Sequence, residues 1–203
     1  QLRHPHVCQV LDFGSTSVEL EGAATVTSYL CLAFMDGGSL TDRLETGEPI
    51  DLRQAAEWIV RLASALEFAH RRGMVHGDLK PSAIVFDADA HPYLTDFSVT
   101  PNPPAGGQWV AGTPAYMAPE LWQVGTPSAL SDQFALAALA YYLVTGSRPF
   151  EGQEQPEIRR RNFATGPIPA HQEAEHNGRP GVLRGVSAVL ARGLSSDAGA
   201  RYA

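Results

Sequence analysis

The segment Val75-His76-Gly77-Asp78-Leu79-Lys80-Pro81 sets polar side chains within an apolar frame. Two segments of the same kind follow it: Leu94-Thr95-Asp96-Phe97-Ser98, and Gly112-Thr113-Pro114-Ala115-Tyr116-Met117-Ala118-Pro119-Glu120. Lys80 is the single lysine among 15 basic residues, so a compact ammonium here indicates chemistry rather than drift. The three segments together predict a functional site.

Helical patterns lie on both sides of these segments. Apolar residues recur at helical spacing over Leu52–Arg72, with Asp51 as cap, and this stripe comprises Leu52, Ala55, Ala56, Ile59, Leu62, Ala63 and Leu66. The run Asp132–Val144 is apolar nearly all round, which predicts a central, buried helix that ends at Gly146. A capping box at Ser39-Leu40-Thr41-Asp42 predicts a short helix, and further helices are expected around Glu157–Arg161 and over Val182–Gly193.

Strand patterns are concentrated near the beginning of the chain. Val7–Phe13 and Ala24–Phe34 predict a hairpin, and Ile84–Phe86 and Tyr93–Thr95 predict two short strands. Pro101–Gly107 is rich in proline and glycine and is predicted to be a loop. The expected fold is therefore mainly α, within the α+β class.

The composition excludes several classes of protein. The 203 residues are 44% hydrophobic and carry a formal net charge of −7, which indicates a globular chain and disfavours a nucleic-acid partner. The longest apolar run, Phe134–Val144, is too short to span a bilayer. Cys8 and Cys31 cannot build a disulfide framework, so we expect a reducing, cytoplasmic location.

The order and spacing of the three polar segments resemble the eukaryotic-type serine/threonine protein kinases, in the form that bacteria also carry. The resemblance covers essentially the whole chain, and it also includes Leu2–Val7, Ala33–Leu40, Ser131–Leu136, Thr145–Phe150 and Asp197–Arg201. It implies a protein kinase-like fold, with residues 1–35 as the remnant of the small lobe and 36–203 as the large lobe. The chain is then expected to be a piece of a longer protein, cut before the last helix of that lobe.

The resemblance implies roles for residues of the site. Asp78 matches the catalytic aspartate that accepts the proton of the substrate hydroxyl, and Lys80 the lysine that stabilises charge on the transferred phosphoryl group. Thr113 matches the threonine that forms hydrogen bonds with both the catalytic aspartate and this lysine. Asp96 matches the ligand of Mg²⁺ on the phosphates of ATP. For adenine, the resemblance implies contacts with Leu32, the backbone of Ala33 and Met35, and Val85.

Several supporting residues also match the family. Glu120 and Arg201 resemble its buried ion pair, and Asp132 is expected to hold the backbone of the catalytic loop. A hydrophobic stack joining the lobes is expected to contain Val10, His76 and Phe97. The sequence Asp12-Phe13-Gly14 looks like the metal-binding motif, but it precedes the catalytic loop and is assigned no metal role.

The chain departs from the family pattern at several positions. Ala83 stands where a metal-binding Asn is expected, and Ser98 stands where Gly is expected. Gly77 stands where the family has an Arg that binds the phosphorylated activation loop. No glycine-rich phosphate loop precedes these motifs, nor do the strand lysine and its glutamate partner. Tyr142 occupies a position where kinases directed at basic substrates place Glu, which disfavours an arginine-rich substrate.

Three functions remain open from the sequence. The first is a serine/threonine kinase with a protein substrate, ATP and Mg²⁺, and weak activity. The second is a pseudokinase that serves as a regulatory module for a protein partner, which Ala83 and Ser98 favour. The third is a small-molecule kinase, because His76-Gly77-Asp78 also opens the catalytic loop of that class, but Lys80-Pro81 and Gly112–Glu120 argue against it.

Overall fold

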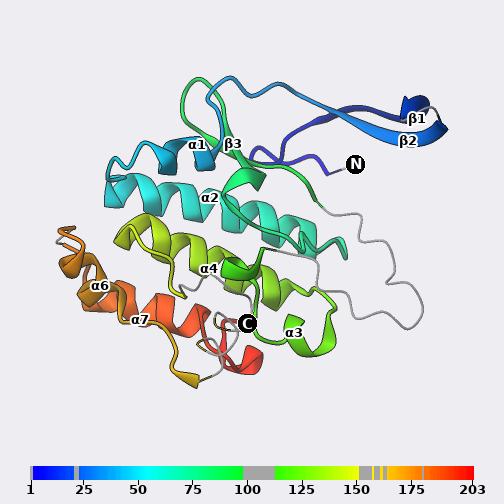
Figure 1. Cartoon of the computed structure of the whole chain (residues 1–203). Coiled ribbons are helices and arrows are strands. Elements are labelled where there is room, and N and C mark those ends of the chain that lie inside the picture. The colour runs from blue at the N-terminus through cyan, green and yellow to red at the C-terminus, as the bar shows by residue number, and fades with distance from the viewer. Residues whose placement is uncertain are drawn as a thin grey trace.

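A hairpin and a small second sheet flank a body of helices in the computed structural model, which describes residues 2–20, 23–97, 113–150, 157, 161, 164–179 and 181–203 (Figure 1). The elements, in chain order, are β1 (Val10–Leu20), β2 (Ala23–Leu32), α1 (Leu40–Glu45), α2 (Leu52–His70), β3 (Ile84–Phe86), β4 (Pro92–Leu94), α3 (Leu121–Val124), α4 (Ala129–Thr145), α6 (Ala170–His176) and α7 (Arg184–Gly193). Helices outweigh strands among these elements, which confirms the mainly α composition expected from the sequence.

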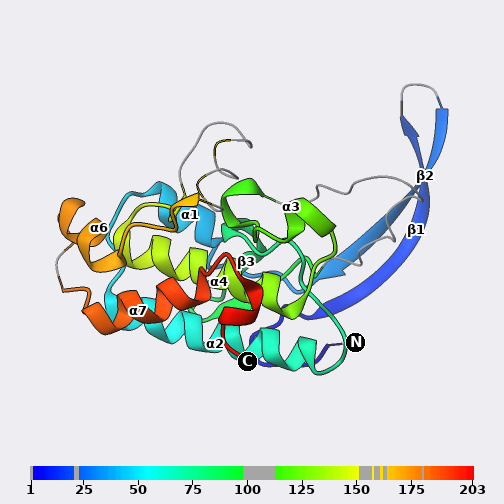
Figure 2. The ribbon, with the colours of Figure 1, turned by 90° about the horizontal axis from the view of Figure 1, so that it is seen from below.

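The predicted hairpin is present, but its first strand starts later than expected. Strands β1 and β2 pair antiparallel, with Gly14 opposite Tyr29, and project away from the helices in both views (Figures 1 and 2). The prediction that a strand begins at Val7 was wrong, because Val7 forms an isolated bridge with Leu94 instead. Cys8 likewise donates its N–H to the Leu94 carbonyl at 2.8 Å, which ties this stretch to the second sheet.

Helix α2 begins where its cap predicts. The Asp51 carboxylate accepts hydrogen bonds from the N–H groups of Arg53 and Gln54 at 2.9 and 3.2 Å. The buried face differs from the predicted stripe, because Leu52 is 37% exposed and Trp58 is 4% exposed. The Trp58 indole donates to the Ala90 carbonyl at 3.1 Å, so the ring is buried without leaving its N–H unpaired.

Helix α4 is the centre of the body and packs against α2, α6 and α7 (Figure 1). Ser128 and Ser131 form a capping box, which starts the helix three residues before the predicted Asp132. Gly146, at φ +80°, ends it as expected. The predicted helix over Val182–Gly193 starts at Arg184, and the predicted loop Pro101–Gly107 lies outside the described residues.

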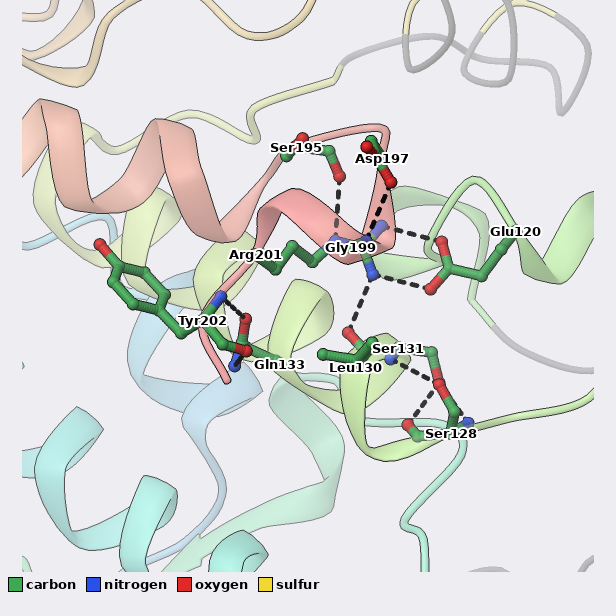
Figure 3. Close-up of polar contacts among 10 residues, drawn as sticks. All are labelled: Glu120, Ser128, Leu130, Ser131, Gln133, Ser195, Asp197, Gly199, Arg201 and Tyr202. Carbon is green, nitrogen blue, oxygen red and sulfur yellow. Dashed lines mark hydrogen bonds and ion pairs between the residues drawn. The ribbon is translucent and has the colours of Figure 1, made fainter.

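The predicted ion pair joins the segment before α3 to the end of the chain. Both Arg201 terminal nitrogens donate to the Glu120 carboxylate, at 2.7 and 2.8 Å (Figure 3). Arg201 also donates to the Leu130 carbonyl at 3.0 Å and to the Ser195 carbonyl at 2.9 Å. The Arg201 side chain has no exposed surface, whereas 26% of the Glu120 side chain remains exposed. These bonds fix the base of α4 to the C-terminal turn.

None of the helices in the described ranges is both long enough and apolar enough to cross a membrane.

Candidate functional site

Asp132 of α4 holds the backbone of the loop that carries Asp78 through hydrogen bonds, as predicted. The buried Asp132 carboxylate accepts the backbone N–H of His76 at 2.8 Å and that of Gly77 at 2.9 Å. It also accepts a hydrogen bond from the ring of His70, at the end of α2, at 2.8 Å, and this contact was missed from the sequence. Gly77 lies at φ +82°, a conformation that costs glycine little.

His76 links this loop to the segment that carries Asp96. Its Nε2 donates to the Thr95 carbonyl at 2.9 Å, and its ring lies 4.9 Å from the Phe97 ring. Burial lowers the pKa of the imidazole, although the nearby Asp132 carboxylate opposes the shift. A neutral ring suits the bond to a carbonyl oxygen. Two members of the predicted stack therefore touch, while Val10 lies at the start of β1.

Asp78, Lys80 and Thr113 come together although they are 35 residues apart at the extremes. The Asp78 carboxylate accepts the Thr113 backbone N–H at 3.0 Å and the Thr113 hydroxyl at 3.4 Å. Its second oxygen forms an ion pair with the Lys80 ammonium. About a third of each charged side chain stays exposed, at 30% for Asp78 and 32% for Lys80, so both can meet a ligand. This arrangement positions a carboxylate next to a cation at the surface.

Asp96 presents a carboxylate to solvent from a strained backbone. Its φ of +56° is unusual for a residue other than glycine, and its Oδ1 accepts the Thr95 hydroxyl at 3.3 Å. Ala83, at the position where the family places an Asn, is fully buried and has no donor atom. Among the described residues no group of three or more His, Cys, Asp or Glu side chains is placed to hold a metal. Mg²⁺ on a nucleotide needs one or two protein carboxylates, so the residues fit a single ion on Asp96.

The residues predicted to contact adenine lie at the end of β2, in the segment that follows it, and in β3. Leu32 ends β2 and is half-buried, as are Ala33 and Met35 beyond it. The Ala33 N–H donates to the Gln9 carbonyl at 2.9 Å, and the Ala33 carbonyl accepts the Cys8 thiol at 3.4 Å, so both backbone groups of Ala33 already have partners. Val85 is half-buried between two buried neighbours of β3, so its side chain is on the face opposite the core.

The sequence Asp12-Phe13-Gly14 lies in β1, on the projecting hairpin. The Asp12 carboxylate accepts the Tyr29 hydroxyl at 3.4 Å, and Phe13 is 77% exposed. It is therefore part of a strand in this structure. Ser98, by contrast, lies outside the described residues.

Chemically, the site offers a carboxylate base paired with an ammonium, and a second, exposed carboxylate able to hold a divalent cation. That set matches charge stabilisation and proton acceptance at a hydroxyl nucleophile. Its support comes from α2 and α4, through His70 and Asp132.

Comparisons with known proteins agree with this geometry. The sequence profile described as "Protein kinase domain" matches residues 1–189. The chain is 29% identical to serine/threonine-protein kinase PknB of Mycobacterium leprae, over 99% of this chain and 32% of that protein. It is 30% identical to PknB of Mycobacterium tuberculosis, over 99% of this chain and 32% of that protein. PknA of Mycobacterium tuberculosis is 30% identical over 88% of this chain and 42% of its own length, so the chain spans less than half of each relative.

Proposed function

The chain belongs to the protein kinase family, as a eukaryotic-type serine/threonine kinase domain of the bacterial form, and we propose that it transfers the γ-phosphoryl group of ATP to a protein hydroxyl. The observation that carries the proposal is the Asp78 carboxylate held between the Lys80 ammonium and the backbone N–H of Thr113. A base fixed in this way is preorganised to receive a proton.

In the proposed reaction, the hydroxyl oxygen of a substrate Ser or Thr bonds to the γ-phosphorus as the bond from that phosphorus to ADP breaks. Asp78 orients this hydroxyl and accepts its proton, a contribution of about 10²–10⁴ in rate. Lys80 lies beside Asp78 and compensates negative charge on the moving phosphoryl group. Thr113 keeps the carboxylate in place from the segment that would face the substrate.

Asp96 is proposed to bind the single Mg²⁺, and Leu32, Ala33, Met35 and Val85 to hold the adenine ring. When bound, Mg²⁺ would neutralise charge on the nucleotide phosphates. Because Ala83 contributes no donor, we expect transfer to be about 10–100-fold slower than with a second ligand, from the cost of one lost interaction with a charged group. The lack of a donor atom at Ala83 also supports the second candidate, a pseudokinase that serves as a regulatory module for a protein partner.

The test uses the full-length protein that contains this chain. Incorporation of labelled phosphate from ATP is measured for the wild type and for Asp78→Asn, which keeps the shape of the side chain but not its basicity. Thermal stabilisation by ATP is measured with and without Mg²⁺, for the wild type and for Asp96→Asn. Transfer that Asp78→Asn abolishes would support the kinase. Magnesium-dependent binding with no transfer would favour the pseudokinase. No binding at millimolar ATP would reject the kinase and leave the pseudokinase module.

A further inference from the structure

A cavity of about 350 Å³ opens directly beside the proposed catalytic residues. Its lining includes Lys80 and Thr113 of the proposed site, together with Tyr116, Tyr142, Arg148 and Glu45 of α1. We propose that this cavity binds an acidic side chain of the protein substrate, near the residue that accepts phosphate, and that Arg148 selects it. The inference rests on the proposed function, since it names the substrate class of the same site.

Arg148 is held by a rigid turn after α4. The buried Thr145 hydroxyl donates to the Ser147 carbonyl at 2.9 Å, and Asn177 donates to the Thr145 carbonyl at 3.0 Å. Two residues after Arg148, the buried Phe150 ring stacks on Phe134 at 6.0 Å. The backbone on both sides of Arg148 is therefore fixed, while its side chain is exposed at the cavity. Because the backbone here is already fixed, no loop has to become ordered when the guanidinium binds an anion, which reduces the entropy cost of binding.

A second observation in the cavity wall also calls for a hydrogen-bond acceptor. Tyr116 is 4% exposed, and within the described residues its buried O–H has no acceptor. Burial raises the pKa of this hydroxyl, and Arg148 opposes the rise by its charge and by a hydrogen bond that its side chain donates to the phenol oxygen. The phenol therefore stays a neutral donor next to a cation. A carboxylate bound to Arg148 would supply the acceptor that this donor lacks.

The charges around the cavity favour an anion at Arg148 in particular. The charge of Lys80 is already compensated by Asp78, whereas Arg148 has no ion pair within the described part of the chain. Its guanidinium lies 6.0 Å from the Tyr142 ring centre, a contact that leaves the positive charge uncompensated. Glu45 of α1 is exposed and also lines the cavity. Its negative charge repels an acidic side chain from that part of the cavity and favours binding next to Arg148.

The test measures peptide binding to the full-length protein, so it does not depend on phosphate transfer. Fluorescent peptides carry Ala at the acceptor position, and Asp is scanned over the flanking positions of a neutral sequence, each against its Asn counterpart. We expect one position at which Asp binds about three- to tenfold tighter than Asn, the size of a partly exposed pair with Arg. Arg148→Gln should abolish that difference, and Arg148→Lys should keep part of it.

Arg3→Gln is the matched control, because Arg3 is exposed, carries the same charge and does not line the cavity. It should retain the full preference for Asp. The proposal would be overturned by equal binding of Asp and Asn peptides at every position, by no binding at millimolar peptide, or by an unchanged preference in Arg148→Gln. Parallel assays with Ser in place of Ala report on phosphate transfer separately, so failure of the kinase proposal alone leaves the binding result readable.

Discussion

Removing one partner of the ion pair between Glu120 and Arg201 should destabilise the fold by about 3 kcal/mol. Replacing Arg201 by Met removes four hydrogen bonds and leaves the Glu120 carboxylate without its cation. Breaking a buried pair in this way costs about 3–5 kcal/mol. Water can reach the 26% of the Glu120 side chain that is exposed, which places the expected loss for Arg201→Met near the lower end, at about 3 kcal/mol.

A double-mutant cycle separates this pair from the other bonds of Arg201. Denaturant unfolding is measured for the wild type, Arg201→Met, Glu120→Gln and the double variant. The double variant should lose less stability than the two single losses added together, by about 2 kcal/mol, because each single change already removes the pairing. The remaining loss in Arg201→Met belongs to the carbonyls of Leu130 and Ser195.

The coupling energy between Arg201 and Glu120 decides whether the pair behaves as a buried one. A value below about 0.5 kcal/mol would mean that the pair behaves like an exposed surface ion pair. It would refute the reasoning from burial, even if both single variants were strongly destabilised. Arg192→Gln is a suitable control, because Arg192 donates to the Ala200 and Arg201 carbonyls but contacts no carboxylate among the described residues.

Three further changes test the site. Asp132→Asn should speed hydrogen exchange at the His76 and Gly77 amides at least tenfold, because a neutral amide can no longer accept all three bonds, each worth about 1.5–3 kcal/mol. His76→Phe should reduce the loss of melting temperature between pH 7 and pH 5: burial holds the folded pKa below the ordinary 6.5, so the unfolded state takes up the proton first and stability falls as pH drops. Ala83→Asn in the full-length protein should raise phosphate transfer about 10–100-fold by restoring a metal ligand, as a labelled-ATP assay would measure.

Each of these has a contrary result. Unchanged exchange at the two amides would show that Asp132 does not fix the loop. An equal loss of melting temperature in His76→Phe would assign the pH dependence to other groups, such as His4 and His6, whose pKa values burial also lowers. Unchanged transfer in Ala83→Asn would mean that the number of metal ligands does not limit the rate.

The sequence predicts best those features that depend on neighbouring residues. The Asp51 cap, the capping box at Ser39 and the stop at Gly146 are each set within a few positions, and the structure contains all of them. Burial of Trp58 was missed because it depends on the Ala90 carbonyl, 32 residues away. An aliphatic stripe alone does not reveal such a partner.

The hairpin and the site show the same limit. The start of β1 was misplaced because Val7 and Cys8 pair with Leu94, a contact that no local pattern encodes. The part of Asp132 in holding the loop was predicted through a family resemblance, yet its bond to His70 was not. The proposed roles of Asp78, Lys80, Thr113 and Asp96 stay predictions, since geometry brings the first three together but does not measure a reaction.

Gly77 has a consequence for how such a domain could be controlled. Its N–H donates to the buried Asp132 carboxylate, and it has no side chain that could bind a phosphate group elsewhere on the protein. The shape of the loop is therefore decided when the chain folds and not when a signal arrives. If the proposed phosphate transfer holds, a phosphatase that removes phosphate from the domain should leave its basal rate unchanged, which a labelled-ATP assay before and after treatment would measure.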